Sequence, residues 1–232
     1  MTAFFITATD TDIGKTFVAA GLIRTFKQRG LAAQGLKPIV SGYDPRTAAA
    51  SDPGVLLSAM GETVTDEAVA RIAPWRFVAP LSPDMAAARE NRAIDFAELM
   101  AFSRKAVAEK TDVLLIEGVG GIMVPLGPPR TTLDWMLALN LPVVLVAGSY
   151  LGALSHTLSA IDVILRRNLR IAAIALNESA GSTVALDETA ATLKRYVATS
   201  PASAAPIIAI PRLSGGTPDH ASFELLANTL LK

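Results

Sequence analysis

The most constraining feature of the sequence is a short apolar segment that runs into a polar loop and then into Gly14-Lys15-Thr16. Residues Phe4–Thr7 are predominantly apolar on both faces, which is typical of a strand buried within a parallel sheet. Residues Lys15–Arg29 show the periodicity of a helix. A strand followed by a helix begins a β–α–β unit, whose second strand lies parallel to the first. The chain is therefore constrained to an α/β fold.

Short apolar runs and longer helical stretches alternate along the rest of the chain. The other predicted strands are Ala33–Lys37, Val113–Glu117, Val143–Ala147, Ile171–Leu176 and Pro206–Ile210. The other predicted helices are Asp95–Glu109, Leu154–Arg167, Ala185–Val197 and Phe223–Leu231. Hydrophobic residues make up 51% of the 232 residues, enough for one sizeable core. We expect a single domain over residues 1–232, a doubly wound, mostly parallel sheet flanked by helices.

Residues 42–93 interrupt this alternation. They contain proline turns and three short helical pieces, Gly54–Met60, Asp66–Ile72 and Ser82–Arg89. We interpret this segment as a helical insertion over the sheet rather than a second domain. We expect it to carry contacts to substrate and metal.

Composition and charge exclude several functional classes. The 21 Lys and Arg residues balance 21 Asp and Glu residues, so bulk charge does not favour binding to nucleic acid or to an anionic membrane. The sequence has no cysteine, which excludes disulfides, thiolate metal sites and cysteine nucleophiles. The first residues, MTAFFITATD, lack the basic segment of a signal peptide, so we expect a cytoplasmic protein.

The loop before Lys15 suits a phosphate group. In a phosphate-binding loop, unpaired backbone N–H groups and the dipole of the following helix both favour an anion. Lys15 would bridge the β- and γ-phosphates of a nucleotide, and the hydroxyl of Thr16 would hold Mg²⁺. The pattern G-x-x-x-x-G-K-[ST] is met except at Thr9, which replaces the first glycine. The alternative is an ordinary strand-to-helix turn capped by polar residues.

Other polar residues stand where strands end or helices begin. Ligands of doubly wound sheets bind beyond the carboxyl ends of the strands, which directs Lys37 toward the same crevice, although a lysine at such a position is more often merely solvated. Glu117 closes four apolar residues and precedes a glycine loop, where an acid can hold Mg²⁺. Asp52 alone could simply cap the helix that follows it. On sequence alone, a structural role suits His156 best.

Taken together, these motifs resemble those of the dethiobiotin synthetase family, ATP-dependent carboxylases that close the ureido ring in biotin synthesis. The resemblance rests on Thr9–Thr16, Lys37–Gly42, Ser51-Asp52, Pro80–Pro83, Glu117–Gly121, Leu151-Gly152 with His156, and Asn177. These segments occur in the family's order and span nearly the whole chain. The motif Lys-Pro-x-x-Ser-Gly following T-D-T-x-x-G-K-T is far more specific than either motif alone.

The resemblance implies a P-loop NTPase-like fold and a role for each matching position. Lys37 and Lys15 would be catalytic, and Thr16, Asp52 and Glu117 would hold Mg²⁺. The substrate contacts would be Ser41 and Thr11, together with Leu151 and Gly152 from the other subunit of a homodimer. The ATP contacts would be Asp12, Ile13, Gly14, Lys15, Thr16, Phe17, Asp52, Glu117, Gly118, Val119, Gly120, Asn177, Glu178, Pro211, Arg212 and Leu213.

The implied reaction consumes ATP, CO₂ or bicarbonate, and the diamine 7,8-diaminononanoate. The diamine takes up CO₂ as a carbamate, which attacks the γ-phosphorus of ATP. The neighbouring amine then traps the carbamic–phosphoric anhydride and releases phosphate and dethiobiotin. Such phosphoryl transfer needs mainly positioning and charge stabilisation, which lysines, loop amides and Mg²⁺ supply.

Four residues depart from the family's pattern. Ala8 replaces a glycine, Asp12 a glutamate, Asp84 a histidine and Glu178 an aspartate. Three other P-loop classes are alternatives. A small-molecule kinase would need an arginine-rich lid, whereas the arginines of residues 42–93 are scattered rather than clustered, at Arg46, Arg71, Arg76, Arg89 and Arg92. A partitioning or septum-positioning ATPase carries a lysine four positions before the last loop glycine, where this chain has Asp10. A cobyrinate-type amide ligase usually adds a glutamine-hydrolysing domain built around cysteine, which this sequence lacks.

Overall fold

A six-stranded parallel sheet forms the centre of the computed structural model, which describes residues 2–109, 111–199, 205–212 and 220–232. The strand order is β10-β9-β8-β1-β5-β2, and each neighbouring pair is parallel. The strands are β1 (Thr2–Ala8), β2 (Ala33–Leu36), β5 (Val113–Gly121), β8 (Val143–Gly148), β9 (Ile171–Asn177) and β10 (Ile207–Ile210). The six strands expected from the apolar runs are all present, and the parallel sheet is confirmed.

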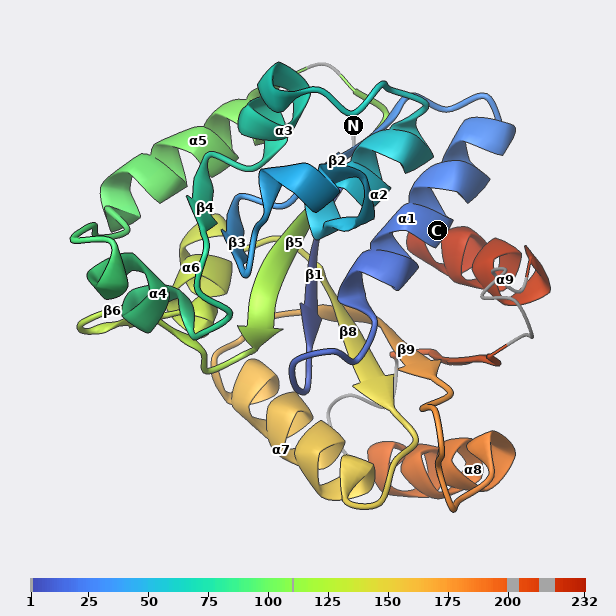
Figure 1. Ribbon diagram of the computed structural model, residues 1–232. Helices are drawn as coiled ribbons and strands as arrows, with labels where there is room; N and C mark the ends of the chain where they lie inside the picture. The colour runs from blue at the N-terminus through green and yellow to red at the C-terminus, as the bar shows by residue number, and fades with distance from the viewer. Residues whose placement is uncertain (1, 110, 200–204, 213–219) are drawn as a thin grey trace.

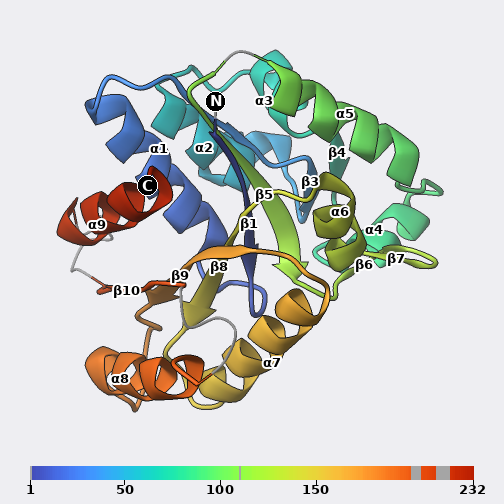
Figure 2. The ribbon, with the colours of Figure 1, turned by 180° about the vertical axis from the view of Figure 1, so that it is seen from behind.

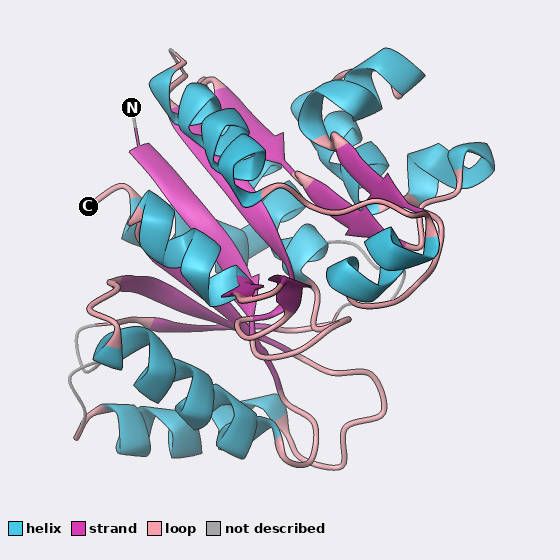
Figure 3. Ribbon diagram, turned by 90° about the vertical axis from the view of Figure 1, so that its left-hand side faces the viewer, coloured by secondary structure: helices cyan, strands magenta, loops and turns pink. Residues whose placement is uncertain are grey.

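Helices cover both faces of this sheet (Figure 1, Figure 2). On one face lie α1 (Lys15–Gln28), α2 (Asp52–Met60) and α9 (His220–Leu230). On the other lie α5 (Phe96–Ala108), α6 (Thr132–Leu139), α7 (Ala153–Arg166) and α8 (Leu186–Val197). Figure 3, turned by 90°, shows helices on either side of the strands. Because β1 is central and covered from both sides, Phe4, Phe5 and Ile6 are fully buried.

Residues 42–93 contain short elements, of which α2 reaches the central sheet. They contain η1 (Pro45–Ala50), α2, α3 (Asp66–Ile72), β4 (Trp75–Phe77) and α4 (Pro83–Arg89). Helix α2 contacts α1 and β2. Strand β4 pairs in parallel with β3 (Ile39–Ser41) as a separate two-stranded sheet, which the sequence analysis did not predict. Three residues are too few to show the periodicity of a strand.

The elements between β5 and β8 are likewise absent from the strands and helices expected from the sequence. Strands β6 (Pro125–Gly127) and β7 (Arg130–Thr131) form an antiparallel hairpin, and α6 follows directly. A sequence signal for α6 existed, because Thr131 and Asp134 form a capping box at its start. Within the described residues, no helix has both the length and the apolar character needed to cross a membrane.

Two helices begin in the same unusual way at the carboxyl edge of the sheet. Helix α1 follows β1, and α7 follows β8, the strand beside β1. The residues preceding them, Gly14 and Gly152, have φ of 94° and 97°, and neither helix has a side-chain cap. A positive φ favours glycine. The first N–H groups of both helices are therefore left without side-chain partners.

Candidate active site

The loop between β1 and α1 has a backbone suited to binding an anion. Asp12 has a φ of 56° and Gly14 a φ of 94°, so the chain turns sharply before the helix. A Cβ at Gly14 would lie 2.5 Å from Nδ2 of Asn177, so a larger residue would not fit there. The uncapped first turn of α1 points its N–H groups toward the loop, where a phosphate would find both donors and the helix dipole.

Lys15 lies at the start of α1 and is almost completely buried. Its Nζ donates to the backbone oxygen of Asp10 at 3.1 Å. Burial, reinforced by the nearby charge of Lys37, lowers the pKa of Lys15 to about 8. The protein therefore holds an ammonium beside the loop without a carboxylate in direct contact with it.

Lys37, Asp52 and Glu117 form a buried charged cluster next to this loop. Nζ of Lys37 lies 2.6 Å from Oε1 of Glu117 and 3.0 Å from Oδ2 of Asp52. It also donates to the backbone oxygen of Gly118 at 2.9 Å. Lys37 directly follows β2, Asp52 begins α2, and Glu117 lies in β5. Ser51, not Asp52, caps α2, so the Asp52 carboxylate is free to face the lysine.

The electrostatics of the cluster follow from its burial and its mixed charges. Burial favours a neutral lysine, but the carboxylates of Glu117 and Asp52 outweigh it and raise the pKa of Lys37. Burial raises the pKa of Asp52, but Lys37 outweighs it, so the Asp52 pKa lies below its ordinary value. Burial is the largest influence on Glu117 and raises its pKa, against the opposing effect of Lys37.

A cleft of about 640 Å³ brings these groups together with other predicted site residues. Its walls are Thr11, Asp12, Gly14, Lys15, Thr16, Lys37, Val40, Ser41, Asp52, Pro80, Leu81, Ser82, Pro83, Glu117, Val119, Gly120 and Val124. Oγ of Ser41 and Oε2 of Glu117 are buried and have no hydrogen-bond partner among the described residues. Since both residues line the cleft, these oxygens are candidate contacts for a bound group.

The side-chain oxygens of Thr16, Asp52 and Glu117 are suitable ligands for a small hard cation such as Mg²⁺. Oγ1 of Thr16 donates a hydrogen bond to Oε1 of Glu117 at 2.7 Å. The carboxylates of Asp52 and Glu117 both form ion pairs with Lys37. Neighbouring ligands of an octahedral Mg²⁺ are about 2.9 Å apart, given bonds of about 2.0–2.1 Å. The described residues contain no group of three or more acidic, His or Cys side chains suited to a metal. A cation here would take further ligands from a bound nucleotide.

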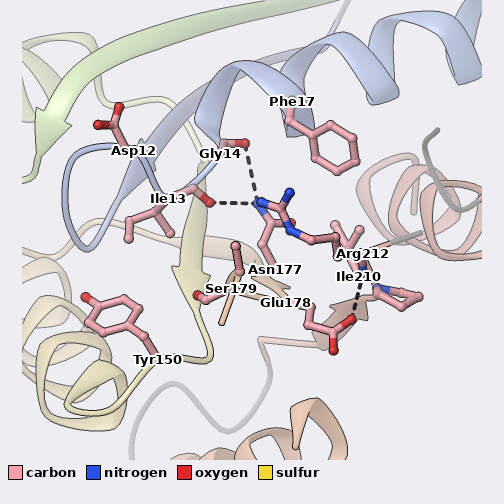
Figure 4. A pocket seen from close by; sticks show the side chains of 12 residues that line it. Asp12, Ile13, Gly14, Phe17, Tyr150, Asn177, Glu178, Ser179, Ile210 and Arg212 are labelled. Carbon is pink, nitrogen blue, oxygen red and sulfur yellow. Dashed lines mark hydrogen bonds between the residues drawn. The ribbon is translucent and has the colours of Figure 1, made fainter. Parts of the chain in front are cut away.

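A second cavity, of about 440 Å³, lies on the other side of the loop (Figure 4). It is lined by Asp12, Ile13, Gly14, Phe17, Tyr150, Asn177, Glu178, Ser179, Ala180, Ile210, Pro211 and Arg212. Asn177 donates through Nδ2 to the backbone oxygen of Ile13 at 2.8 Å, and its Oδ1 is buried without a partner in the described part of the chain. Glu178 accepts from the backbone N–H of Arg212 at 2.8 Å.

Three of the predicted residues that the structure describes, Gly118, Leu151 and Gly152, line neither cavity. Leu151 is 84% exposed, and Gly152 directly precedes α7. His156 lies in the first turn of α7, where its Nδ1 is 2.7 Å from the hydroxyl of Tyr150. Leu213 lies outside the described residues.

Sequence reasoning missed Tyr150 and Ser179 as lining residues of the second cavity. Tyr150 follows β8 and Ser179 follows β9, each by two positions. The rule that directed attention to Lys37, a position just beyond the carboxyl end of a strand, would have found both. Val40 and Val124, which line the cleft, carried no such signal because they are ordinary apolar residues.

Comparison with known sequences places the chain among close relatives. A family profile described as an AAA domain matches residues 2–215. The ATP-dependent dethiobiotin synthetase of Acidiphilium cryptum is 49% identical over 87% of this chain and 91% of its own length. That of Phenylobacterium zucineum is 46% identical over 78% and 77% of the two chains. That of Caulobacter strain K31 is 44% identical over 89% and 88%.

Solved structures support the fold. The septum site-determining protein MinD of Pyrococcus horikoshii, solved with Mg-ADP, aligns with a TM-score of 0.58 at 16% identity, covering 100% of this chain and 96% of that one. The MinC:MinD complex of Aquifex aeolicus aligns with a TM-score of 0.58 at 13% identity, covering 100% and 95%. At such identities the likeness concerns the fold alone, whereas the sequence relatives are similar over most of both chains. The chain therefore belongs to the dethiobiotin synthetase family.

Proposed function

We propose that this protein converts 7,8-diaminononanoate, CO₂ and ATP into dethiobiotin, ADP and phosphate. One amine of the diamine adds to CO₂ and loses a proton, forming a carbamate. A carbamate oxygen attacks the γ-phosphorus and ADP leaves. The second amine then attacks the carbonyl carbon of the carbamic–phosphoric anhydride, and phosphate leaves as the ring closes. A cytoplasmic location, expected from the sequence, is part of this proposal.

One observation carries the proposal: the cleft contains both a nucleotide loop and an independent set of polar groups facing it. Lys15 and Thr16 come from the loop, whereas Lys37 and Ser41 come from beyond β2. A phosphoryl group between the two sets would be near two lysines, which stabilise the charge of the transition state. Lys37 would serve the carbamate and the transferring phosphoryl group, and Ser41 and Thr11 the substrate.

Mg²⁺ is proposed to bind at Thr16, Asp52 and Glu117. When bound with ATP, the ion would neutralise charge on the phosphate oxygens. The unpartnered Oε2 of Glu117 and the 2.7 Å contact between Thr16 and Glu117 support this choice. Gly118 and the residues after it would let the backbone approach the phosphates, because Val119 and Gly120 line the same cleft.

The second cavity is proposed to hold the adenine and ribose of ATP. It adjoins the phosphate loop through Asp12 and Gly14, which line both cavities. Hydrogen bonds to the loop fix the orientation of Asn177, so its Oδ1 is an acceptor suited to an amino group. The other proposed contacts are Ile13, Phe17, Glu178, Pro211, Arg212 and Leu213.

A homodimer is proposed to complete the diamine site. Leu151 and Gly152 lie outside the cleft of their own chain, and α7 begins without a side-chain cap. A second subunit related by a two-fold axis would bring this helix N-terminus to the substrate carboxylate, where N–H groups favour an anion.

The decisive experiment measures phosphate release with ATP and Mg²⁺ in the presence and absence of diamine plus bicarbonate. We expect release to depend on both cosubstrates and to match the formation of the cyclic urea one to one. A switch ATPase would release phosphate equally without them. That result would overturn the proposed reaction while leaving the nucleotide site intact.

A further inference from the structure

Three oxygen atoms of the protein already surround the ammonium of Lys37. Its ammonium has three donors and no acceptor. It donates hydrogen bonds to Oε1 of Glu117 at 2.6 Å and to the backbone oxygen of Gly118 at 2.9 Å. It also forms an ion pair with Oδ2 of Asp52 at 3.0 Å. The side chain is only 4% exposed. The lysine proposed to serve the reacting groups must therefore exchange partners before it can do so.

Its partners are the same two carboxylates that are proposed to hold Mg²⁺. The side chain of Glu117 is 1% exposed, and a carboxylate so buried is costly without a compensating positive charge. Lys37 supplies that charge through direct contact. The ammonium thus fills the electrostatic role that a divalent cation would otherwise take at this pair.

A divalent cation without a nucleotide would have to displace Lys37 from the two carboxylates, which is unfavourable. It would take the carboxylates from Lys37 and leave that ammonium buried beside a new positive charge, with Lys15 also close enough to interact. A cation that arrives with a triphosphate brings anionic oxygens. These give both lysines new acceptors, so hydrogen bonds and charge remain balanced.

We propose that Lys37 is an internal counter-ion that keeps free Mg²⁺ from the Asp52–Glu117 pair, so that the metal is retained only with a nucleotide. This inference rests on the proposed metal site and adds the order in which its ligands bind. Lys37 turns from the carboxylates to the reacting groups only when the metal–nucleotide complex has taken its place.

Mn²⁺ binding, followed by electron paramagnetic resonance, tests this inference without reference to turnover. Wild type, Lys37→Gln and Lys15→Gln are titrated with Mn²⁺, with and without a non-hydrolysable ATP analogue. Without the analogue, Lys37→Gln is expected to bind Mn²⁺ at least about tenfold more tightly than wild type. Lys15→Gln is the matched control, because it removes a nearby charge that does not touch the carboxylates. The increase in Mn²⁺ affinity should be smaller in Lys15→Gln than in Lys37→Gln.

Different results would contradict the counter-ion role of Lys37 and the proposed metal site. Equal affinities of wild type and Lys37→Gln for Mn²⁺ alone would overturn the counter-ion role. Failure of wild type to bind Mn²⁺ even with the analogue would instead overturn the proposed metal site.

A second measurement covers the case in which Lys37→Gln does not fold. In wild-type protein with ¹⁵Nζ-labelled lysine, the Lys37 ammonium resonance should stay unchanged with Mg²⁺ alone and shift with Mg²⁺ plus the analogue. A shift with Mg²⁺ alone would contradict the inference.

Discussion

At the scale of single residues, the two lysines of the cleft differ in what surrounds them. Burial and the charge of Lys37 lower the pKa of Lys15 to about 8. For Lys37, the carboxylates of Glu117 and Asp52 outweigh burial and raise the pKa. Lys15 is thus the lysine whose charge can change near neutral pH, and Lys37 the one that stays charged.

Nucleotide affinity should therefore fall as the pH rises above about 8. A triphosphate favours the charged form of Lys15, so binding must add a proton wherever the free protein has lost it. Below pH 8 the lysine is already charged and the dependence vanishes; above it the loss approaches about tenfold per pH unit. Calorimetric titration with a non-hydrolysable ATP analogue measures this. Lys15→Arg is the control, because its guanidinium remains charged.

Lys37→Gln should lower kcat by about 10²–10³-fold, the typical loss when one preorganised donor is removed. Affinity for the ATP analogue should change much less, since the loop and the metal hold the phosphates. Lys37→Arg should not restore full activity, because a planar guanidinium cannot take the place of a compact ammonium held by three oxygen atoms. Single-turnover phosphate release tests both variants. Activity of Lys37→Gln within about tenfold of wild type would exclude its catalytic role.

At the scale of elements, the packing of α1 against α9 depends on one small residue. Gly21 lies in α1, and a Cβ there would come within 2.2 Å of the ring of Phe223 in α9. The same ring packs edge-on against Phe17 in the first turn of α1, with centroids 5.5 Å apart. Because Phe17 also lines the second cavity, this contact joins the helix interface to the candidate nucleotide site.

Gly21→Ala should destabilise the protein although alanine favours helices. The gain in helix propensity is about 1 kcal/mol, whereas overpacking a filled core costs about 1–3 kcal/mol. Urea unfolding measures the net effect. Adding Phe223→Leu makes room for the methyl group, so the double variant should lose less stability than the two single changes added together. If the stability losses of Gly21→Ala and Phe223→Leu were additive, the Phe223 ring would not be what the alanine methyl group clashes with.

At the scale of the whole molecule, two cavities meet at one loop, whereas Leu151 and Gly152, which precede α7, line neither of them. The cleft and the second cavity share Asp12 and Gly14, so one nucleotide can span them. Leu151 is 84% exposed at the other helix start. A site completed by a second subunit would make Leu151 and Lys37 act together across an interface.

Subunit mixing tests this arrangement. Leu151→Asp should leave folding nearly unchanged, because the side chain is exposed, but should repel the substrate carboxylate and raise the KM for the diamine. At a diamine concentration far below the KM of the Leu151→Asp variant, both variants alone are nearly inactive. Under this condition, mixing Leu151→Asp with Lys37→Gln in equal amounts should restore about a quarter of wild-type activity, since half of the dimers are mixed and each has one intact site. No recovery on mixing, with exchange of subunits verified, would place the whole site within one chain.

The sequence alone determined the parts of the protein that depend on neighbouring residues. The six central strands are apolar on both faces, so their local composition revealed a buried parallel sheet, and the phosphate loop lies within one continuous segment. Position relative to the strand ends directed attention to Lys37 and Glu117. The resemblance to a known family supplied their proposed roles and those of Asp52 and Asn177. Short elements such as β3 and β4 lacked enough residues for a periodic signal.

The tertiary structure decided which of these residues meet, because contacts between distant segments depend on packing rather than on periodicity. The insertion folds back so that α2 begins beside the end of β2, which brings Asp52 to 3.0 Å from Lys37. The parallel pairing of β2 with β5 brings Glu117 to the other side of the same ammonium. Only this convergence shows a lysine surrounded by three oxygen atoms. Because Glu117 is buried, its negative charge requires a positive charge in contact with it, and Lys37 supplies that charge.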